Sequence, residues 1–220
     1  MLNVEHCEKY VISLAHRGDR RKKFFDSMKS HGFSEKEFQW LRAVEDPDFG
    51  GLGCSKSHLK ALVNFLTEST KPYCAIFEDD FVFRQSKDVC EQIIQTLDDK
   101  TTWDVFAFAG TEVRSFSTDC DVHEHMLERV FDSVTASGYL VSRQYAHVLI
   151  ENLLESIVGM EKYKHIEQRK IVYRKYALDR TWNRLQSRDS WFCTQPMLGH
   201  QTPSFSDIEK KQVDYAEYSS

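Results

Sequence analysis

The chain of 220 residues is 41% hydrophobic and 29% charged, which is typical of a globular protein, and we expect one domain over residues 1–220. Its net charge of −5 gives no sign of the excess of basic residues that is typical of bulk nucleic-acid binding, so no nucleic-acid partner is expected. No apolar run approaches the ~20 residues that span a bilayer, and the first residues lack an apolar signal core, so we expect a cytoplasmic protein without a membrane span.

The cysteines indicate the redox environment. Six of them are widely separated and form no C-x-x-C pair. Several lie inside apolar runs, where free thiols are commonly buried. We therefore expect free thiols in a reducing compartment and no structural zinc.

The N-terminal part of the chain predicts a strand, a loop and a helix. Residues 9–14 form a short β-rich run, and the basic loop AHRGDRRKK follows. The apolar face of the next helix is formed by Phe24, Phe25 and Met28, and Gly32 is a typical stop. Ser13, Arg17 and Arg20 would lie where a strand ends and a helix begins, which suits anionic ligands. A solvated basic face is the alternative explanation for the arginines.

A second strand is predicted at residues 40–44, followed by a glycine-rich loop over residues 45–53. From Cys54 onward, apolar residues recur with helical spacing. The two serines of the segment CSKSH would lie in the first turns of this helix, where capping is their ordinary role. Cys54 and His58 stand four residues apart and could form a thiolate pair, but the sequence reveals no third group to orient them.

Residues 73–83, with the sequence YCAIFEDDFVF, are the most informative stretch. An apolar run that fits a buried strand ends in Glu78, Asp79 and Asp80. Adjacent carboxylates repel one another, and burial adds a desolvation cost, so we expect a compensating cation. Hard divalent ions suit oxygen ligands, and open α/β sheets bind ligands at the carboxyl ends of their strands. A solvated acidic turn is the alternative.

The rest of the chain alternates between predicted helices and strands. Helices are expected at residues 86–97, 142–154 and 177–185, and strands at residues 102–111, 130–141 and 190–194. Residues 195–209 are predicted as a loop rich in side chains that can bind ligands, His200 among them. This alternation predicts an α/β domain with a central, mostly parallel sheet and helices on both faces.

The order of motifs resembles glycosyltransferase family 25, which includes lipopolysaccharide-modifying and collagen-modifying sugar transferases. The motifs span nearly the whole chain: YVISLAHRGDRR, GCSKSHLKAL, FEDDFVF, SGYLVSR, ALDRTW and QPMLGHQTPSFSDIE. The pairing of the GCSKSH helix start with the EDD strand end is the most specific part. The resemblance implies a single GT-A (Rossmann-like) domain that uses a nucleotide-sugar donor, usually UDP-linked, with Mn²⁺ or Mg²⁺. Members in large DNA viruses would be similarly compact and signal-free.

The resemblance also implies roles for individual residues. Asp80 would bind the metal, with Glu78 and His200 as further ligands. The donor-binding residues would be Ser13, Leu14, Arg17, Arg20, Ser57, His58, Glu78, Asp79, Gly110 and Gly138. Asp179 falls where the family has an acidic residue near the acceptor. Residues 1–110 would mainly bind the nucleotide sugar, and residues 111–220 would supply the acceptor side and a closing C-terminal loop.

The chemistry of sugar transfer places demands on these residues. Charge develops on the departing diphosphate, and a metal held by Asp80 would stabilise it. In an inverting reaction Asp179, or secondarily Asp207, would deprotonate the acceptor hydroxyl. One sequence leaves inverting and retaining reactions open.

We therefore predict transfer of a hexose or deoxyhexose from a UDP-sugar to a hydroxyl of a glycan acceptor. Two other classes stay open. One is a nucleotide-sugar binding module without turnover. The other is a nucleotidyl- or phosphotransferase, for which the sequence lacks a P-loop or a second spaced acidic pair.

Overall fold

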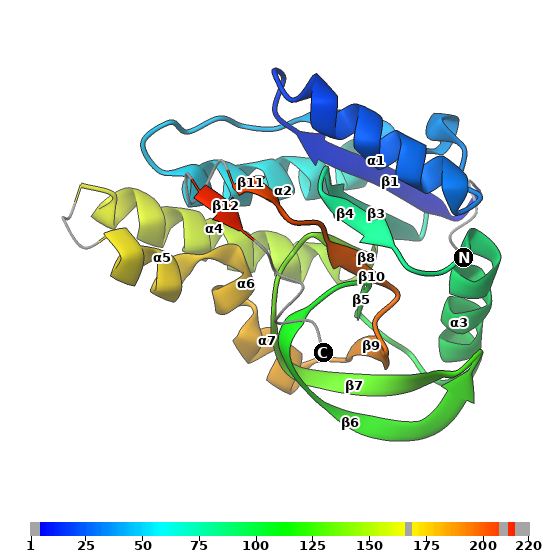
Figure 1. The fold of residues 1–220 in the computed structure, drawn as a ribbon. Helices are drawn as coiled ribbons and strands as arrows, with labels where there is room; N and C mark the ends of the chain where they lie inside the picture. The colour runs from blue at the N-terminus through cyan, green and yellow to red at the C-terminus, as the bar shows by residue number, and fades with distance from the viewer. Residues whose placement is uncertain (1–4, 166–168, 207–210, 214–220) are drawn as a thin grey trace.

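The computed structural model describes residues 5–165, 169–206 and 211–213. Within these residues, eight strands form one sheet at the centre of the molecule (Figure 1). In spatial order they are β2 (Gln39–Arg42), β1 (Cys7–Ser13), β3 (Tyr73–Glu78), β8 (Gly138–Ser142), β5 (Val105–Ala107), β9 (Trp191–Gln195), β7 (His125–Val134) and β6 (Thr111–Val122). Strands from the two halves of the chain are interleaved at the centre, so both halves build the same sheet.

The sheet is mixed. β2, β1 and β3 run parallel, as do β5 and β9, whereas β8 pairs antiparallel with β3 and β5, and β7 pairs antiparallel with β9 and β6. Of the described strands in this sheet, only β8 and β7 oppose the common direction. The predicted α/β class with a central, mostly parallel mixed sheet is therefore confirmed. The single strand predicted at residues 130–141 is divided into β7 and β8 by a bend at residues 135–137.

Helices cover both faces of the sheet, as predicted. The main ones are α1 (Gly18–Ser30), α2 (Gly50–Glu68), α3 (Lys87–Lys100) and α4 (Ala146–Tyr163). Phe24 of α1 and Ile93 of α3 join one apolar cluster with Phe77 of β3. Leu62 of α2 joins a second cluster with Ile76 of β3, and α4 packs beside α2. Since neighbouring strand residues point to opposite faces, a strand covered on both sides must be apolar on both faces, as β3 is up to its last residue, Glu78.

Helix α2 begins at Gly50, earlier than the predicted start at Cys54. The glycines that suggested a loop are part of the helix. Glycine is needed at these positions because neighbouring atoms leave no room for a side chain. A Cβ atom at Gly53 would lie 2.6 Å from the carbonyl oxygen of Val44, and one at Gly51 would overlap the ring of Tyr173. Close packing of α2 against its neighbours therefore accounts for these glycines.

The serines of α2 do not cap the helix, so that prediction is wrong. Because the helix starts at Gly50, they lie beyond its first residues and are buried. Ser57 Oγ donates to the carbonyl of Gly53 at 2.7 Å and accepts from the backbone N–H of Val44 at 2.8 Å. Ser55 Oγ lies 3.2 Å from Ser156 Oγ of α4. These serines fasten α2 to its surroundings.

The segment after β9 is not the simple loop that the sequence predicts. β10 (Gly199–Gln201) pairs antiparallel with β4 (Phe81–Phe83), the strand that directly follows the acidic triplet. A second pair is formed by β11 (Ser204–Ser206) and β12 (Lys211–Val213). β4 gains a hydrogen-bonded partner in this way, which brings the C-terminal segment to the end of β3. Asp207, the second predicted base, lies outside the described residues.

In the part of the chain that the structure describes, three shorter helices follow α4. They are α5 (Arg169–Tyr176), α6 (Leu178–Thr181) and α7 (Asn183–Arg188). All six cysteines are free thiols, as predicted. Among the described residues, no helix combines the length and the apolar character that crossing a membrane would require.

We predict that Gly53→Ala lowers the free energy of unfolding by about 1–3 kcal/mol, because the backbone of Val44 would have to move. Urea denaturation followed by circular dichroism measures this change. Gly18→Ala is the control, since the nearest atom to its added Cβ is a side-chain nitrogen of Arg21 at 3.5 Å. Its effect should stay within about 0.5 kcal/mol. Wild-type stability of Gly53→Ala would refute the packing explanation.

Candidate active site

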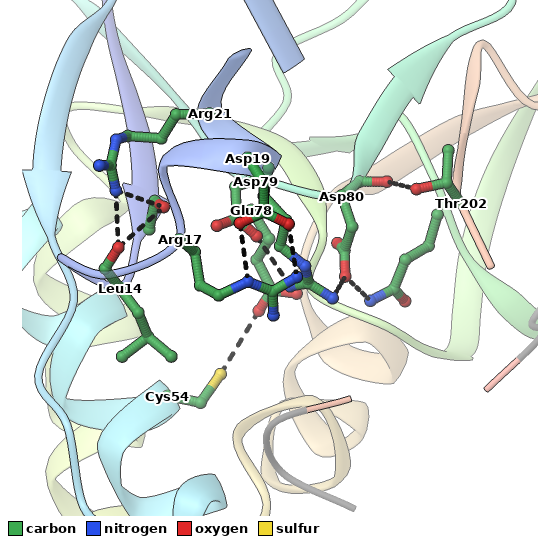
Figure 2. A network of polar contacts seen from close by, with 12 residues as sticks. Leu14, Arg17, Asp19, Arg21, Cys54, Glu78, Asp79, Asp80 and Thr202 are labelled. Atoms are coloured by element: carbon green, nitrogen blue, oxygen red, sulfur yellow. Dashed lines mark hydrogen bonds and ion pairs between the residues drawn. The ribbon is translucent and has the colours of Figure 1, made fainter. Parts of the chain in front are cut away.

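β3 carries the acidic triplet to the carboxyl-terminal edge of the sheet. Glu78 ends the strand, and Asp79 and Asp80 form the turn into β4. Asp79 and Asp80 expose only 6% and 8% of their side chains. Figure 2 shows the three acids grouped together, with Cys54 and Thr202 nearby. Three neighbouring carboxylates held largely away from water need charge compensation, as the sequence predicts.

A guanidinium supplies part of this compensation. Arg20, in the first turn of α1, places one terminal nitrogen 2.9 Å from Asp79 Oδ1 and the other 3.4 Å from Asp80 Oδ2. The hydroxyl of Ser13, at the end of β1, also hydrogen-bonds to Asp79. Burial nevertheless raises the pKa of Asp79, because Ser13 and Arg20 only partly offset the loss of water. The structure thus brings the predicted donor-binding residues Ser13 and Arg20 to the triplet, where both contact its carboxylate groups.

Helix α2 holds Glu78 from another side. His58 Nε2 lies 3.2 Å from Glu78 Oε1, and the Cys54 thiol donates to the same oxygen at 3.4 Å. His58 Nδ1 lies 3.1 Å from the hydroxyl of Tyr139 on β8. Burial acts to raise the pKa of Glu78, but His58, Cys54 and Arg20 together outweigh it and lower that pKa. Glu78 is therefore a permanent anion at neutral pH.

Asp80 lies in a different environment. Gln201 Nε2 donates to Asp80 Oδ2 at 3.0 Å, and the backbone N–H of Thr202 donates to the Asp80 carbonyl at 2.8 Å. The other carboxylate oxygen, Oδ1, is buried and has no hydrogen-bond partner among the described residues. Burial first, and then the charge of Glu78, raise the pKa of Asp80 to about 7. A buried oxygen of this kind fits a divalent cation, which would favour the ionised form.

A pocket of about 240 Å³ lies beside Glu78. Its walls come from the start of α2, the end of β3, the start of β6, the bend between β7 and β8, the α5–α6 segment and β10. Cys54, Glu78 and Asp179 line it together. The predicted base Asp179 and the last residue of the acidic strand therefore share one space, although they are far apart in the sequence.

Asp179 is held by the bend between β7 and β8. Its Oδ2 accepts a hydrogen bond from the backbone N–H of Thr135 at 3.1 Å. Burial raises the pKa of Asp179, and Thr135 and Arg180 offset this only in part. Thr135 has a φ of 88°, a left-handed conformation that costs a β-branched residue on the order of 1–3 kcal/mol. A carboxylate with a raised pKa beside a strained backbone is typical of functional sites.

Two other predicted donor-binding residues lie in the loop between β1 and α1. Arg17 makes a paired contact with the carboxylate of Asp19, at 3.1 and 3.2 Å. The carbonyl of Leu14 accepts from the Arg21 guanidinium at 2.6 Å (Figure 2). Arg21, which the sequence analysis did not single out, thus fastens this loop close to the acidic triplet.

The predicted donor-binding residues Gly110, Gly138 and Ser57 have structural explanations. A Cβ atom at Gly138 would lie 2.6 Å from the ring of Phe81, and one at Gly110 would lie 2.9 Å from the end of Met197. Protein side chains therefore occupy the room that these glycines leave. Ser57 is buried and bonded to backbone, as described above. His58 is fully buried and reaches the site through Glu78.

His200, the predicted additional metal ligand, lies on β10 opposite Val82. Burial first, and then the charges of Arg84 and His31, lower its pKa. Its neighbour Gln201 is the residue of this strand that contacts Asp80. Since successive strand residues point to opposite faces, the described contacts join Gln201 rather than His200 to the triplet. A role of His200 as a metal ligand stays a prediction.

Sequence reasoning missed Tyr139, Gln201 and Thr135. Tyr139 lies in the apolar pattern of β8, and nothing in that pattern distinguishes it from a core residue. Gln201 directly follows His200 in the C-terminal motif, and this neighbour was the one sign in the sequence that Gln201 could lie at the site. The strained φ of Thr135 depends on the bend, which the sequence suggests only through the nearby Ser137–Gly138 pair.

No family model matches the chain, and no curated protein matches it. Similar solved structures include A197 from STIV, with 12% identity and a TM-score of 0.43 over 85% of this chain and 80% of that one. A glycosyltransferase involved in the glycosylation of the major capsid of PBCV-1 has 8% identity and a TM-score of 0.44, over 93% and 97%. Mannose-1-phosphate geranyltransferase from Thermus thermophilus has 10% identity and a TM-score of 0.43, over 83% and 57%. Similarity at this level carries no conclusion about activity.

The raised pKa of Asp80 makes stability depend on pH. A carboxyl group with a folded-state pKa of about 7 binds its proton more tightly in the folded state, so its stabilising contribution is present at low pH and is lost as pH rises through about 7. Asp80→Asn cannot titrate. In metal-free buffer we expect this variant to gain stability relative to wild type between about pH 5 and about pH 8, on the order of 2–4 kcal/mol.

Urea denaturation at both pH values measures this difference. Asp99→Asn, which changes an exposed carboxylate on α3, is the control and should show no such trend. A stability difference between Asp80→Asn and wild type that stays constant with pH would contradict the assigned environment of Asp80.

Proposed function

We propose that this protein is a metal-dependent glycosyltransferase that transfers a hexose or deoxyhexose from a UDP-sugar to a hydroxyl of a glycan acceptor. The observation that carries the proposal is the pocket lined by both Glu78 and Asp179. Departure of the diphosphate from the donor requires negative groups that can hold a cation. Attack by the acceptor hydroxyl requires a base on the other side of the same pocket. The order of motifs that resembles glycosyltransferase family 25 supports the same function.

The donor side would be formed by the acidic triplet and the loop after β1. Mn²⁺ or Mg²⁺ would be held by Asp80, with Glu78 and His200 as further candidate ligands. Such an ion, when bound, supplies positive charge that stabilises the departing diphosphate. Arg20 adds a fixed positive charge at the same carboxylates. Asp79 would contact the nucleoside ribose, as the resemblance implies.

The acceptor side would be formed by α6 and the bend between β7 and β8. In an inverting reaction the acceptor hydroxyl would give its proton to Asp179 as it attacks the anomeric carbon. The raised pKa of Asp179 makes it a stronger base than an ordinary aspartate. Arg180 and Glu112, which are paired at 3.2 Å, also line the pocket and offer polar groups to sugar hydroxyls. In a retaining reaction Asp179 would orient the acceptor instead.

This function predicts release of UDP and formation of a glycosylated product when the protein is incubated with UDP-sugars, Mn²⁺ and a panel of glycan acceptors. Asp179→Asn should lower turnover by about 10²–10⁴-fold, which is the usual contribution of a general base. The variant should keep the donor dissociation constant within about twofold of wild type, because Asp179 lies on the acceptor side of the pocket. Product mass and UDP release measure turnover, and calorimetry measures donor binding.

Asp99→Asn is the matched control, because it removes an exposed carboxylate outside the pocket and should keep wild-type turnover. Donor binding without UDP release from any donor and acceptor pair would identify a binding module. Formation of pyrophosphate or a sugar phosphate in place of UDP would identify a nucleotidyl- or phosphotransferase.

A further inference from the structure

A second group of side chains with metal-binding chemistry lies beside the pocket. Cys54 Sγ, His58 Nε2 and a carboxylate oxygen of Glu78 all lie within 4.8 Å of one another. Cys54 and His58 stand one helical turn apart on α2, and Glu78 comes from the end of β3. The structure therefore supplies the third group that the sequence did not reveal for the Cys54–His58 pair.

The distances within this group are close to those of a tetrahedral metal site. Metal bonds of about 2.0–2.3 Å at tetrahedral angles place two ligand atoms about 3.3–3.6 Å apart. Glu78 Oε1 lies 3.2 Å from His58 Nε2 and 3.4 Å from Cys54 Sγ. Cys54 Sγ and the His58 ring nitrogen lie within 4.8 Å of each other, so these two side chains would move closer together to enclose an ion.

Tyr139 orients the imidazole in the way that metal sites require. Its hydroxyl lies 3.1 Å from His58 Nδ1, and the two rings stack with centroids 5.8 Å apart. A metal-bound histidine commonly donates its other ring N–H to a neighbouring acceptor. A tyrosine hydroxyl can accept as well as donate, so Tyr139 fits His58 with or without a metal.

We propose that Cys54, His58 and Glu78 form a site for a borderline-soft divalent cation such as Zn²⁺, with the remaining coordination position on the pocket side. Cys54 and Glu78 both line the pocket, whereas His58 is buried behind them. Three protein ligands and one open position are the arrangement of catalytic rather than structural zinc sites. A hydroxyl or water in the pocket would complete the coordination.

Binding changes the protonation of the group in a defined way. The Cys54 thiol releases one proton to solvent as the sulfur–metal bond forms. To bind the ion through Nε2, the imidazole would carry its proton on Nδ1, where the Tyr139 hydroxyl can accept it. Without a cation the thiol stays protonated, since burial and then Glu78 raise the pKa of Cys54. A coordinated divalent ion removes that proton because it places two positive charges next to the sulfur.

This site and the one proposed at Asp80 share Glu78 as a candidate ligand, but their other ligand atoms differ in chemistry. Asp80 offers oxygen, which suits Mn²⁺ or Mg²⁺, whereas a thiolate and an imidazole favour Zn²⁺ and Co²⁺. Binding at the Cys54 site can be measured without donor or acceptor, so its outcome does not depend on the proposed function.

Titration of the whole protein with Co²⁺ alone, followed by absorption, tests the proposal. We expect one equivalent to produce a near-ultraviolet thiolate-to-cobalt band with visible bands typical of tetrahedral Co²⁺, and Zn²⁺ to displace both. Cys54→Ser should remove the near-ultraviolet band. Tyr139→Phe should retain the band and weaken Co²⁺ binding by about 10–100-fold, because it removes only the hydroxyl that orients His58.

Two control variants distinguish Co²⁺ bound at this site from Co²⁺ bound by other side chains. Cys120→Ser changes a buried thiol outside the cluster, and Asp80→Asn changes the oxygen site, so both should keep the band. A wild-type titration without a thiolate band would overturn the proposal and leave the three groups as a hydrogen-bonded support for Glu78. A band that survives Cys54→Ser would also overturn it.

Discussion

The crowding of three adjacent carboxylates at the end of β3, two of them buried, is the constraint on which the rest of this structure depends. Three elements contact these acids: Arg20 of α1 pairs with Asp79 and Asp80, His58 of α2 holds Glu78, and Gln201 of β10 donates a hydrogen bond to Asp80. Removing one partner of a buried charge typically costs several kcal/mol, because the other charge stays buried without compensation. The helix starts and the C-terminal strand therefore converge on one edge of the sheet.

This convergence gives neighbouring carboxyl groups different properties. Glu78 has a lowered pKa, whereas burial raises the pKa of Asp80 and of Asp179 across the pocket. Groups of one chemical type whose pKa values are pushed apart can take different roles in a reaction. Glu78 is a permanent anion, Asp80 gains most from a cation, and Asp179 can accept a proton. A nucleotide-sugar reaction would use all three properties.

The sequence predicts the features that depend on local patterns. The apolar run of β3, the helical spacing of α1 and α3, and the acidic strand end all lie where the residues indicate. The early start of α2 was missed because Gly51 and Gly53 are needed for packing against Tyr173 and Val44, which are remote in the sequence. The antiparallel direction of β8 and the contact between Tyr139 and His58 were missed because they too depend on residues that are remote in the sequence. The pairing of β10 with β4, which brings Gln201 to Asp80, likewise depends on tertiary structure.

We propose that the acidic end of β3 is a cation-dependent site for a nucleoside diphosphate. Calorimetric titration of the protein with UDP, with Mn²⁺ and then with chelator, tests it most directly. We expect Mn²⁺ to tighten UDP binding at least about tenfold in wild type, which corresponds to about 1.4 kcal/mol, and to have no such effect on Asp80→Asn. Equal UDP affinity with Mn²⁺ and with chelator, or an undiminished Mn²⁺ effect in Asp80→Asn, would contradict the claim.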